Sequence, residues 1–196
     1  MHWRSRFKRF TARLIVSSLL CLGFWQFGQG AYIPAKAWVA QELMHRAWQK
    51  AEGGNQKPAP WPWADTWPVA RLSAKGGDIE LIILEGGSGR TLAFGPGHLS
   101  ISALPGQNGN SIIAGHRDTH FQFLQYMKIG EKFTVDLPDG RKHHFQVTDI
   151  DVVDSRRGSL ILDTDSPTMS LVTSYPFGAM DAGGPMRYVV SAELLI

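Results

Sequence analysis

Short apolar runs, separated by turns rich in glycine and proline, dominate this chain from residue 69 onward. Such runs, enriched in β-branched residues, are typical of strands, and Pro138-Asp139-Gly140 is a hairpin turn signal between two of them. A single internal helix is predicted at 121–127, ending near Gly130. Strand signals recur from Val69 onward, and the predicted strands are 79–84, 91–94, 111–114, 132–137, 142–150, 159–162, 169–173 and 188–194. This pattern of about eight strands predicts an all-β fold with accessory helices, closed as a barrel or packed as a sandwich.

The basic residues of the chain are concentrated at its N-terminus. Five of the 20 lysines and arginines lie within residues 1–13, where no acidic residue occurs. The remainder carries 15 basic and 17 acidic residues and is therefore slightly acidic. A slightly acidic domain with a basic cap is not the charge distribution of a nucleic-acid binder, so no nucleic-acid partner is expected.

Residues 14–33 carry no charge and approach the roughly 20 residues that span a bilayer. Positive charge before this stretch predicts a single-pass transmembrane anchor with a cytoplasmic N-terminus. The alternative is a cleaved signal peptide, with Ala35-Lys36-Ala37 as its cleavage site. Either interpretation exports the domain. Cys21, the single cysteine, lies inside the stretch, so the exported domain cannot form an internal disulfide.

Residues 34–68 are predicted to connect the anchor to the barrel at 69–196. A helix is expected at 35–52, either packed on the domain or lying at the membrane surface. Its predicted apolar side comprises Trp38, Val39, Leu43 and Trp48. The connector that follows contains Trp61, Trp63 and Trp67 among several prolines. Because tryptophan carries a large apolar area, the connector is expected to pack along the domain or to form an aromatic platform beside a groove.

Three polar side chains follow or precede predicted strands. His116 comes after the strand at 111–114, Ser174 ends the strand at 169–173, and Arg187 precedes the last strand. Strand ends are common positions for functional residues, and Asp118 could orient His116. Taken singly, each residue is as well explained by a structural role.

Other site types fit the residues less well. His116 and His120 have i, i+4 spacing, but arginine follows His116 and no helical pattern covers both, so no metal or other cofactor is expected. The neighbouring His143 and His144 point to opposite faces of their strand and cannot chelate together. Ser174 lacks the Gly-x-Ser-x-Gly turn of α/β-hydrolases.

Several segments together resemble the sortases, which are cysteine transpeptidases of bacterial cell surfaces. The resemblance covers Trp61 to Ile196, and its fuller phrases are similar to the Gram-negative (marine proteobacterial) sortase group. The segments that carry it are Trp63-Ala64-Asp65-Thr66-Trp67-Pro68, Ala93-Phe94-Gly95-Pro96-Gly97-His98, Ala114-Gly115-His116-Arg117-Asp118, Leu171-Val172-Thr173-Ser174-Tyr175-Pro176-Phe177 and Gly184-Pro185-Met186-Arg187-Tyr188-Val189. The resemblance implies an eight-stranded sortase β-barrel, with Ser174 where the family's Thr-Leu-x-Thr-Cys pattern has cysteine.

The resemblance also implies an activity and its partners. A sortase cleaves an exported protein at the Thr–Gly bond of an LPxTG-like C-terminal sorting signal and transfers the acyl group to an amine acceptor. His116 would protonate the leaving amine, Arg187 would stabilise the oxyanion and Ser174 would occupy the nucleophile position. The domain would face the periplasm from the bacterial inner membrane, anchored through residues 14–33.

Ser174 admits three interpretations, because a serine hydroxyl is a far weaker acid than a thiol. It is a deliberate replacement that silences the enzyme, a natural feature of a pseudoenzyme that binds sorting signals without cleavage, or the nucleophile of a serine-dependent peptidase or transpeptidase using His116. Outside this family, a periplasmic scaffold, a peptidoglycan hydrolase and a metal-dependent hydrolase using His116 and His120 stay as alternatives.

Overall fold

The computed structural model describes residues 16–20, 23, 25–26, 36–52, 56–179 and 183–195. The chain divides into two compact units, residues 1–41 and residues 42–196. The predicted basic cap, Cys21 and most of the predicted anchor at 14–33 lie outside the described residues. Within the described ranges, no helix has both the length and the apolar character needed to cross a membrane.

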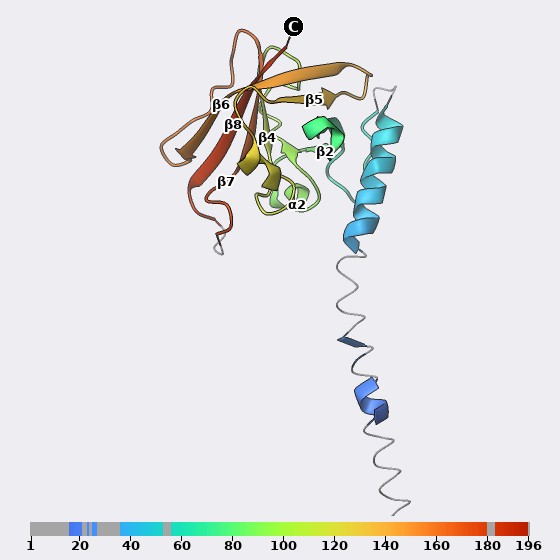
Figure 1. Cartoon of the computed structure of the whole chain (residues 1–196). Helices are drawn as coiled ribbons and strands as arrows, with labels where there is room; N and C mark the ends of the chain where they lie inside the picture. The colour runs from blue at the N-terminus through green and yellow to red at the C-terminus, as the bar shows by residue number, and fades with distance from the viewer. Residues whose placement is uncertain are drawn as a thin grey trace, which may run out of the picture. The chain divides into compact units, whose positions relative to one another are not determined.

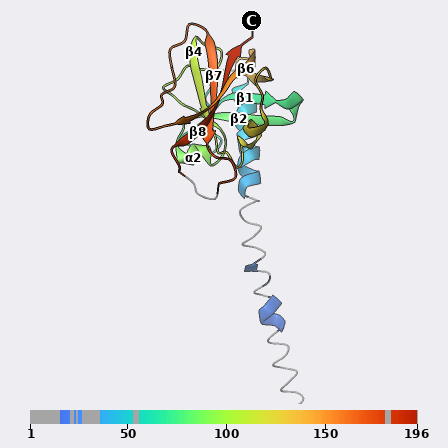
Figure 2. The same ribbon diagram turned by 60° about the vertical axis from the view of Figure 1, so that its left-hand side comes forward.

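The second unit is built around a closed β-barrel of eight strands (Figures 1 and 2). Around the barrel the strands follow the order β1-β2-β3-β4-β7-β8-β6-β5. β4 and β7 run parallel, and so do β2 and β3, whereas the other neighbouring pairs are antiparallel. The strands are β1 (Pro68–Ala74), β2 (Ile79–Glu85), β3 (Gly97–His98), β4 (Gly109–Ala114), β5 (Lys132–Asp136), β6 (Lys142–Asp154), β7 (Pro167–Ser174) and β8 (Met186–Leu194). The expected all-β, eight-stranded barrel is therefore confirmed.

The barrel interior is filled by alternate residues of its strands, as the two-residue period of a strand requires. β1 shows this period in full, because every second residue from Pro68 to Ala74 is buried. Phe133 and Phe145 stack across the β5–β6 pair with ring centroids 5.6 Å apart. Leu171 and Val190, from β7 and β8, are fully buried in the same core.

Two predicted strands are wrong. Residues 91–94 do not form a strand, since the short helix α2 (Gly89–Leu92) occupies this region. The Ser88 hydroxyl accepts a hydrogen bond from the Thr91 backbone N–H at 3.2 Å, which caps the helix and outweighs the weak strand propensity of the segment. Residues 159–162 are not a strand either. Their backbone meets β4 at a single residue, because the Asn110 N–H donates to the Leu162 carbonyl at 2.7 Å.

The predicted helix at 121–127 is a 3₁₀-helix, η2 (Gln122–Tyr126), and a second short one, η1 (Lys75–Gly77), joins β1 to β2. Phe121 and Leu124 lie at the two ends of one i, i+3 step and are fully buried in the core. The i, i+3 repeat of a 3₁₀-helix stacks these two side chains on one face. The segment is helical as expected, but its helix type comes from packing into the barrel.

The helix before the barrel packs on the domain, which is one of its two expected arrangements, because Met44 and Trp48 form a cluster with Ile82 and Leu84 of β2. In the second unit, residues 42–51 are helical, and the side chains they bury are Met44, Ala47, Trp48 and Ala51. Of the predicted apolar side, Trp48 alone belongs to this buried set. The connector tryptophans also differ from one another: Trp61 contacts the Phe94 ring edge-on at 4.7 Å, whereas Trp63 is 81 % exposed.

Candidate active site

Three neighbouring strands bring the predicted site residues to one end of the barrel. The last parallel pair of β4 and β7 is Ala114 opposite Val172, and His116 and Ser174 each follow this pair by two residues along their own chain segments. Ser174 is paired directly with Arg187 as the last antiparallel pair of β7 and β8. Directly paired residues have Cα atoms about 4.5–5.5 Å apart. The order β4-β7-β8, visible in Figure 2, thus groups residues that are far apart in sequence.

Strand alternation places the side chains of Ser174 and Arg187 on the same face. Thr173 is only 2 % exposed, and its partner Tyr188 packs against the core, so this pair points into the barrel. Successive side chains of a strand point to opposite faces, and directly paired residues share a face. Ser174 and Arg187 therefore point outward. Both are half-buried, and His116 is exposed.

Backbone and side-chain hydrogen bonds hold these strand ends together beyond the regular ladder. The Gly115 N–H donates to the Val172 carbonyl at 3.0 Å, and the Thr173 hydroxyl donates to the Gly115 carbonyl at 2.7 Å. On the other side, the Tyr175 N–H donates to the Met186 carbonyl at 3.0 Å. The residues on either side of the predicted catalytic positions are consequently fixed by the sheet.

Arg187 is oriented by its own loop. Its Nη1 donates to the Gly184 carbonyl at 2.5 Å and to the Met186 carbonyl at 2.9 Å. These contacts occupy one of the guanidinium nitrogens. Because the group has five N–H donors, others remain for a ligand that approaches Ser174. A permanently charged, donor-rich group beside the nucleophile position is suited to stabilise a developing oxyanion.

Asp118 lies against Arg117. The Arg117 Nε is 3.2 Å from each carboxylate oxygen of Asp118. Over the part of the chain that the structure describes, no hydrogen bond or ion pair joins Asp118 to His116. The predicted role of Asp118 as an orienter of His116 has no contact to support it, and Asp118 instead orients its neighbour Arg117.

A second histidine lies close to His116. Burial lowers the pKa of His120 below its usual range, and the charge of His116 lowers it further, against a smaller opposing effect of the Phe94 backbone. His120 is thus biased toward its neutral form beside the predicted general acid. Among the residues that the structure describes, no three or more His, Cys, Asp or Glu side chains are grouped so that they could hold a metal ion.

An aromatic cluster forms around Tyr188, the residue that follows Arg187 in β8. Tyr175 stacks on Tyr188 at 6.2 Å between ring centroids, and Phe177 contacts Tyr188 edge-on at 5.1 Å. Burial, followed by the charge of Tyr175, raises the pKa of the Tyr188 hydroxyl. In the sequence these residues stood out only as part of a motif. Phe177 and Tyr188 also pack against the barrel core, so the cluster ties the segment after Ser174 to that core.

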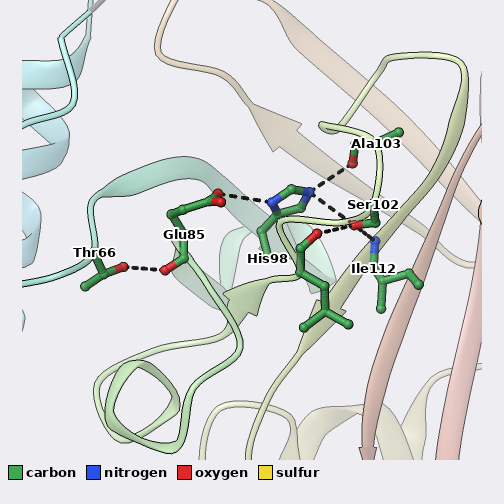
Figure 3. Close-up of polar contacts among 7 residues, drawn as sticks. Thr66, Glu85, His98, Ser102, Ala103 and Ile112 are labelled. Atoms are coloured by element: carbon green, nitrogen blue, oxygen red, sulfur yellow. Dashed lines mark hydrogen bonds and ion pairs between the residues drawn. The ribbon is translucent and has the colours of Figure 1, made fainter.

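His98, the last residue of one of the segments that carry the resemblance, has several polar partners in the structure (Figure 3). Its Nδ1 is 3.2 Å from a carboxylate oxygen of Glu85, and its Nε2 is 3.0 Å from the Ala103 carbonyl. Ser102, which also contacts Nε2, accepts a hydrogen bond from the Ile112 N–H at 3.0 Å. This buried network joins β2, β3, the following loop and β4. It supports β4 from the side opposite β7.

A pocket of about 420 Å³ opens beside the same loop. Its lining residues include Trp67, Glu85, His98, Leu104 and Pro138, and none of the three predicted catalytic residues contributes to it. Because the chemistry-bearing side chains lie on other strand ends, this pocket is not the candidate active site.

Comparisons with known proteins agree with this arrangement. The sortase domain family matches residues 72–195. Sortase D of Bacillus subtilis (strain 168) is 31 % identical over 114 residues, which cover 58 % of this chain and 57 % of that protein. The chain thus spans little more than half the length of this curated relative.

Solved structures show the same fold. A sortase D5 transpeptidase of Clostridium perfringens superposes with a TM-score of 0.65 over 80 % of this chain and 98 % of that one, at 20 % identity. Sortase C-1 of Actinomyces oris superposes with a TM-score of 0.58 at 28 % identity, over 66 % of this chain and 75 % of that one. With the family match covering more than half of its residues, the chain belongs to the sortase family, whose members are transpeptidases.

Proposed function

We propose that this chain carries a sortase-type acyl-transfer site that takes an LPxTG-like sorting signal of an exported protein, and that Ser174 attenuates its turnover. One observation carries the proposal: His116, Ser174 and Arg187 lie at the same end of three adjacent strands. In this site the Ser174 hydroxyl attacks the Thr–Gly carbonyl while His116 takes its proton, and Arg187 donates to the oxyanion. His116 then gives that proton to the amine that departs when the Thr–Gly bond breaks. An amine acceptor then attacks the acyl-enzyme ester, forming an amide bond and breaking the bond to Ser174, and the proton that the amine loses returns to the Ser174 oxygen through His116.

The attenuation follows from the chemistry of the hydroxyl group. A thiol has an ordinary pKa of about 8.5, and a neighbouring cation lowers it into the range where thiolate forms. A serine hydroxyl is not ionised in this range, so a positioned base must remove its proton during attack. That base works best when a third group orients it, and Asp118, the predicted orienter, contacts Arg117.

The membrane location belongs to the same proposal. A basic cap followed by the charge-free residues 14–33 supports an N-terminal anchor with the barrel on the periplasmic side of the inner membrane. In that location the site would meet exported proteins of a bacterium of the Gram-negative type.

The test compares the parent chain with Ser174→Cys and Ser174→Ala on a fluorogenic LPxTG-type peptide, with and without an amine acceptor. Ser174→Cys should turn over at least about 100-fold faster than the parent, because the thiol ionises without a strong base. All three proteins should bind the peptide, and His116→Ala in the cysteine form should lose turnover.

Each outcome has a separate meaning. Equal rates for the serine and cysteine forms would favour the serine-dependent alternative. Peptide binding by all forms with turnover by none would favour the non-catalytic alternative. Absence of both binding and turnover would show that the proposed substrate class is wrong.

A further inference from the structure

The loops that carry His116 and Ser174 are joined by one buried side chain, Arg117. Arg117 is only 7 % exposed although it is charged. A buried guanidinium is costly unless its N–H groups find acceptors. The acceptors of Arg117 therefore reveal which parts of the protein it holds.

All three guanidinium nitrogens donate hydrogen bonds. Nε donates to the Asp118 carboxylate, Nη1 donates to the Pro176 carbonyl at 2.7 Å and Nη2 donates to the Ala179 carbonyl at 2.5 Å. Two of these acceptors are backbone carbonyls of the loop that follows β7. Because the guanidinium is a rigid planar fork, it fixes these two carbonyls relative to each other and to its own backbone.

The backbone conformation of residues 176–179 allows both hydrogen bonds to form. Gly178 has a φ of +73°, a left-handed conformation that glycine adopts without strain, and it lies between the two acceptors. The chain therefore turns tightly enough for Pro176 and Ala179 to face one guanidinium. Pro176 follows Ser174 by two residues, so its carbonyl sets the path of the backbone that leaves the nucleophile position.

Arg117 lies next to His116 in the chain, so its hydrogen bonds to the loop after β7 also affect the position of His116. The regular pairing of β4 with β7 ends before either site residue. Besides the Gly115 contacts, the hydrogen bond from Arg117 to the Pro176 carbonyl connects the segment of His116 to the segment of Ser174. The Nε of Arg117 also donates to the Asp118 carboxylate, which lies on the same loop as His116.

We propose that Arg117 is a positioning residue, which sets the separation of His116 and residue 174 by holding the loop after β7 through the Pro176 and Ala179 carbonyls. The proposal rests on the proposed function for its catalytic consequence. Its structural part stands on the contacts of Arg117 alone. Displacement of a catalytic group by about 1 Å can lower a rate by about 100-fold. A lysine cannot replace Arg117, because a single ammonium cannot bridge the same acceptors in fixed geometry.

The experiment uses the full chain with Ser174→Cys as parent, and adds Arg117→Met or Arg117→Lys. The matched control is Arg141→Met, since Arg141 also donates from Nε to a nearby aspartate, but on the exposed β5–β6 hairpin. Three measurements are made on each protein. They are hydrogen exchange of residues 175–179, the pH profile of iodoacetamide alkylation of the thiol introduced at position 174, and kcat and KM for the LPxTG-type peptide. Alkylation is followed by peptide mass, so that Cys21 does not contribute to the signal.

Both Arg117 variants should exchange faster at residues 175–179 and show a shifted alkylation profile, because residue 174 no longer lies at its fixed distance from His116. Their kcat should fall by about 10- to 100-fold, with KM changed by less than about threefold. Arg141→Met should match the parent in all three measurements.

A purely structural role would lower the unfolding temperature while leaving kcat and the alkylation profile within about twofold of the parent, and this result would overturn the proposal. If Arg117→Met does not fold, Arg117→Lys decides by the same criteria. If the Ser174→Cys parent does not turn over the peptide, the proposed function fails. The exchange and alkylation results still decide the role of Arg117 in that case.

Discussion

Replacement of Gly115 by alanine should destabilise the barrel directly at the residue before His116. An alanine Cβ at this position would lie 2.7 Å from Cδ2 and 2.8 Å from Cγ of the Phe121 ring. Real Cβ atoms do not approach other carbons this closely, so either the ring or the strand end must move. Phe121 is fully buried in the barrel core, which leaves the ring little space for movement.

The size of the effect follows from core overpacking. An extra methyl group in a well-packed core typically costs about 1–3 kcal/mol of unfolding free energy. For a unit of this size each kcal/mol lowers the unfolding temperature by about 2–4 °C, so the expected decrease is about 2–12 °C. The strand end is also constrained, because the Gly115 N–H and carbonyl bond to Val172 and Thr173.

Thermal unfolding followed by circular dichroism measures this decrease. Gly89→Ala is the matched control, because a Cβ at Gly89 meets no atom within 4 Å and its backbone is not left-handed. The control should change stability by less than about 1 kcal/mol. The double variant Gly115→Ala/Phe121→Leu should lose less unfolding free energy than the two single variants lose together, since the smaller side chain leaves room for the methyl group.

Two results would refute this reasoning. Gly115→Ala with an unchanged unfolding temperature would mean that the ring or the strand end adapts without cost. Strictly additive effects in the double variant would mean that the methyl group and the ring do not collide. In either case, the close packing of the strand end against Phe121 would not explain the glycine.

Two further predictions concern buried polar groups. Asn110→Ala should lower the unfolding free energy by about 1–3 kcal/mol in urea titrations, because its amide group exchanges hydrogen bonds with the buried Ser170 hydroxyl; an exposed change such as Asn108→Ala should have no such effect. The pKa of His120 is lowered in the folded state, so the unfolded state binds its proton more readily, and stability should fall as pH drops from about 7.5 through about 6.5. His120→Gln should reduce this fall without removing it, because burial lowers the pKa of His143 in the same direction; an unchanged pH dependence would contradict the assignment.

The sequence predicted the barrel well where β-branched and apolar runs are strong. Strands such as β2 and β7 have continuous β-branched and apolar runs bounded by glycine, proline or polar turns, and they were located to within two residues at each end. The prediction of strands was wrong where the local sequence signal was weak and a single hydrogen bond or the lack of a pairing strand determined the local structure. The segment 91–94 became part of a capped helix because of the Ser88 hydroxyl, and 159–162 found no neighbouring strand with which to pair.

The candidate site was found by motif. Each of His116, Ser174 and Arg187 stands beside a predicted strand, but strand order around a closed barrel cannot be read from a single sequence. Arg117 was visible only as a polar residue after His116. Its function as a link depends on carbonyls about 60 residues away in the chain.

The sequence by itself determined the secondary-structure class, the basic cap, the charge-free stretch at 14–33 and the residues available for chemistry. These features are local, because propensity, period and charge act over a few neighbouring residues. The tertiary structure alone decided that β4, β7 and β8 are adjacent, that Asp118 faces Arg117, and that Arg117 is buried between two loops. Strand pairing and burial depend on residues distant in sequence, whose free energies compete over the whole barrel.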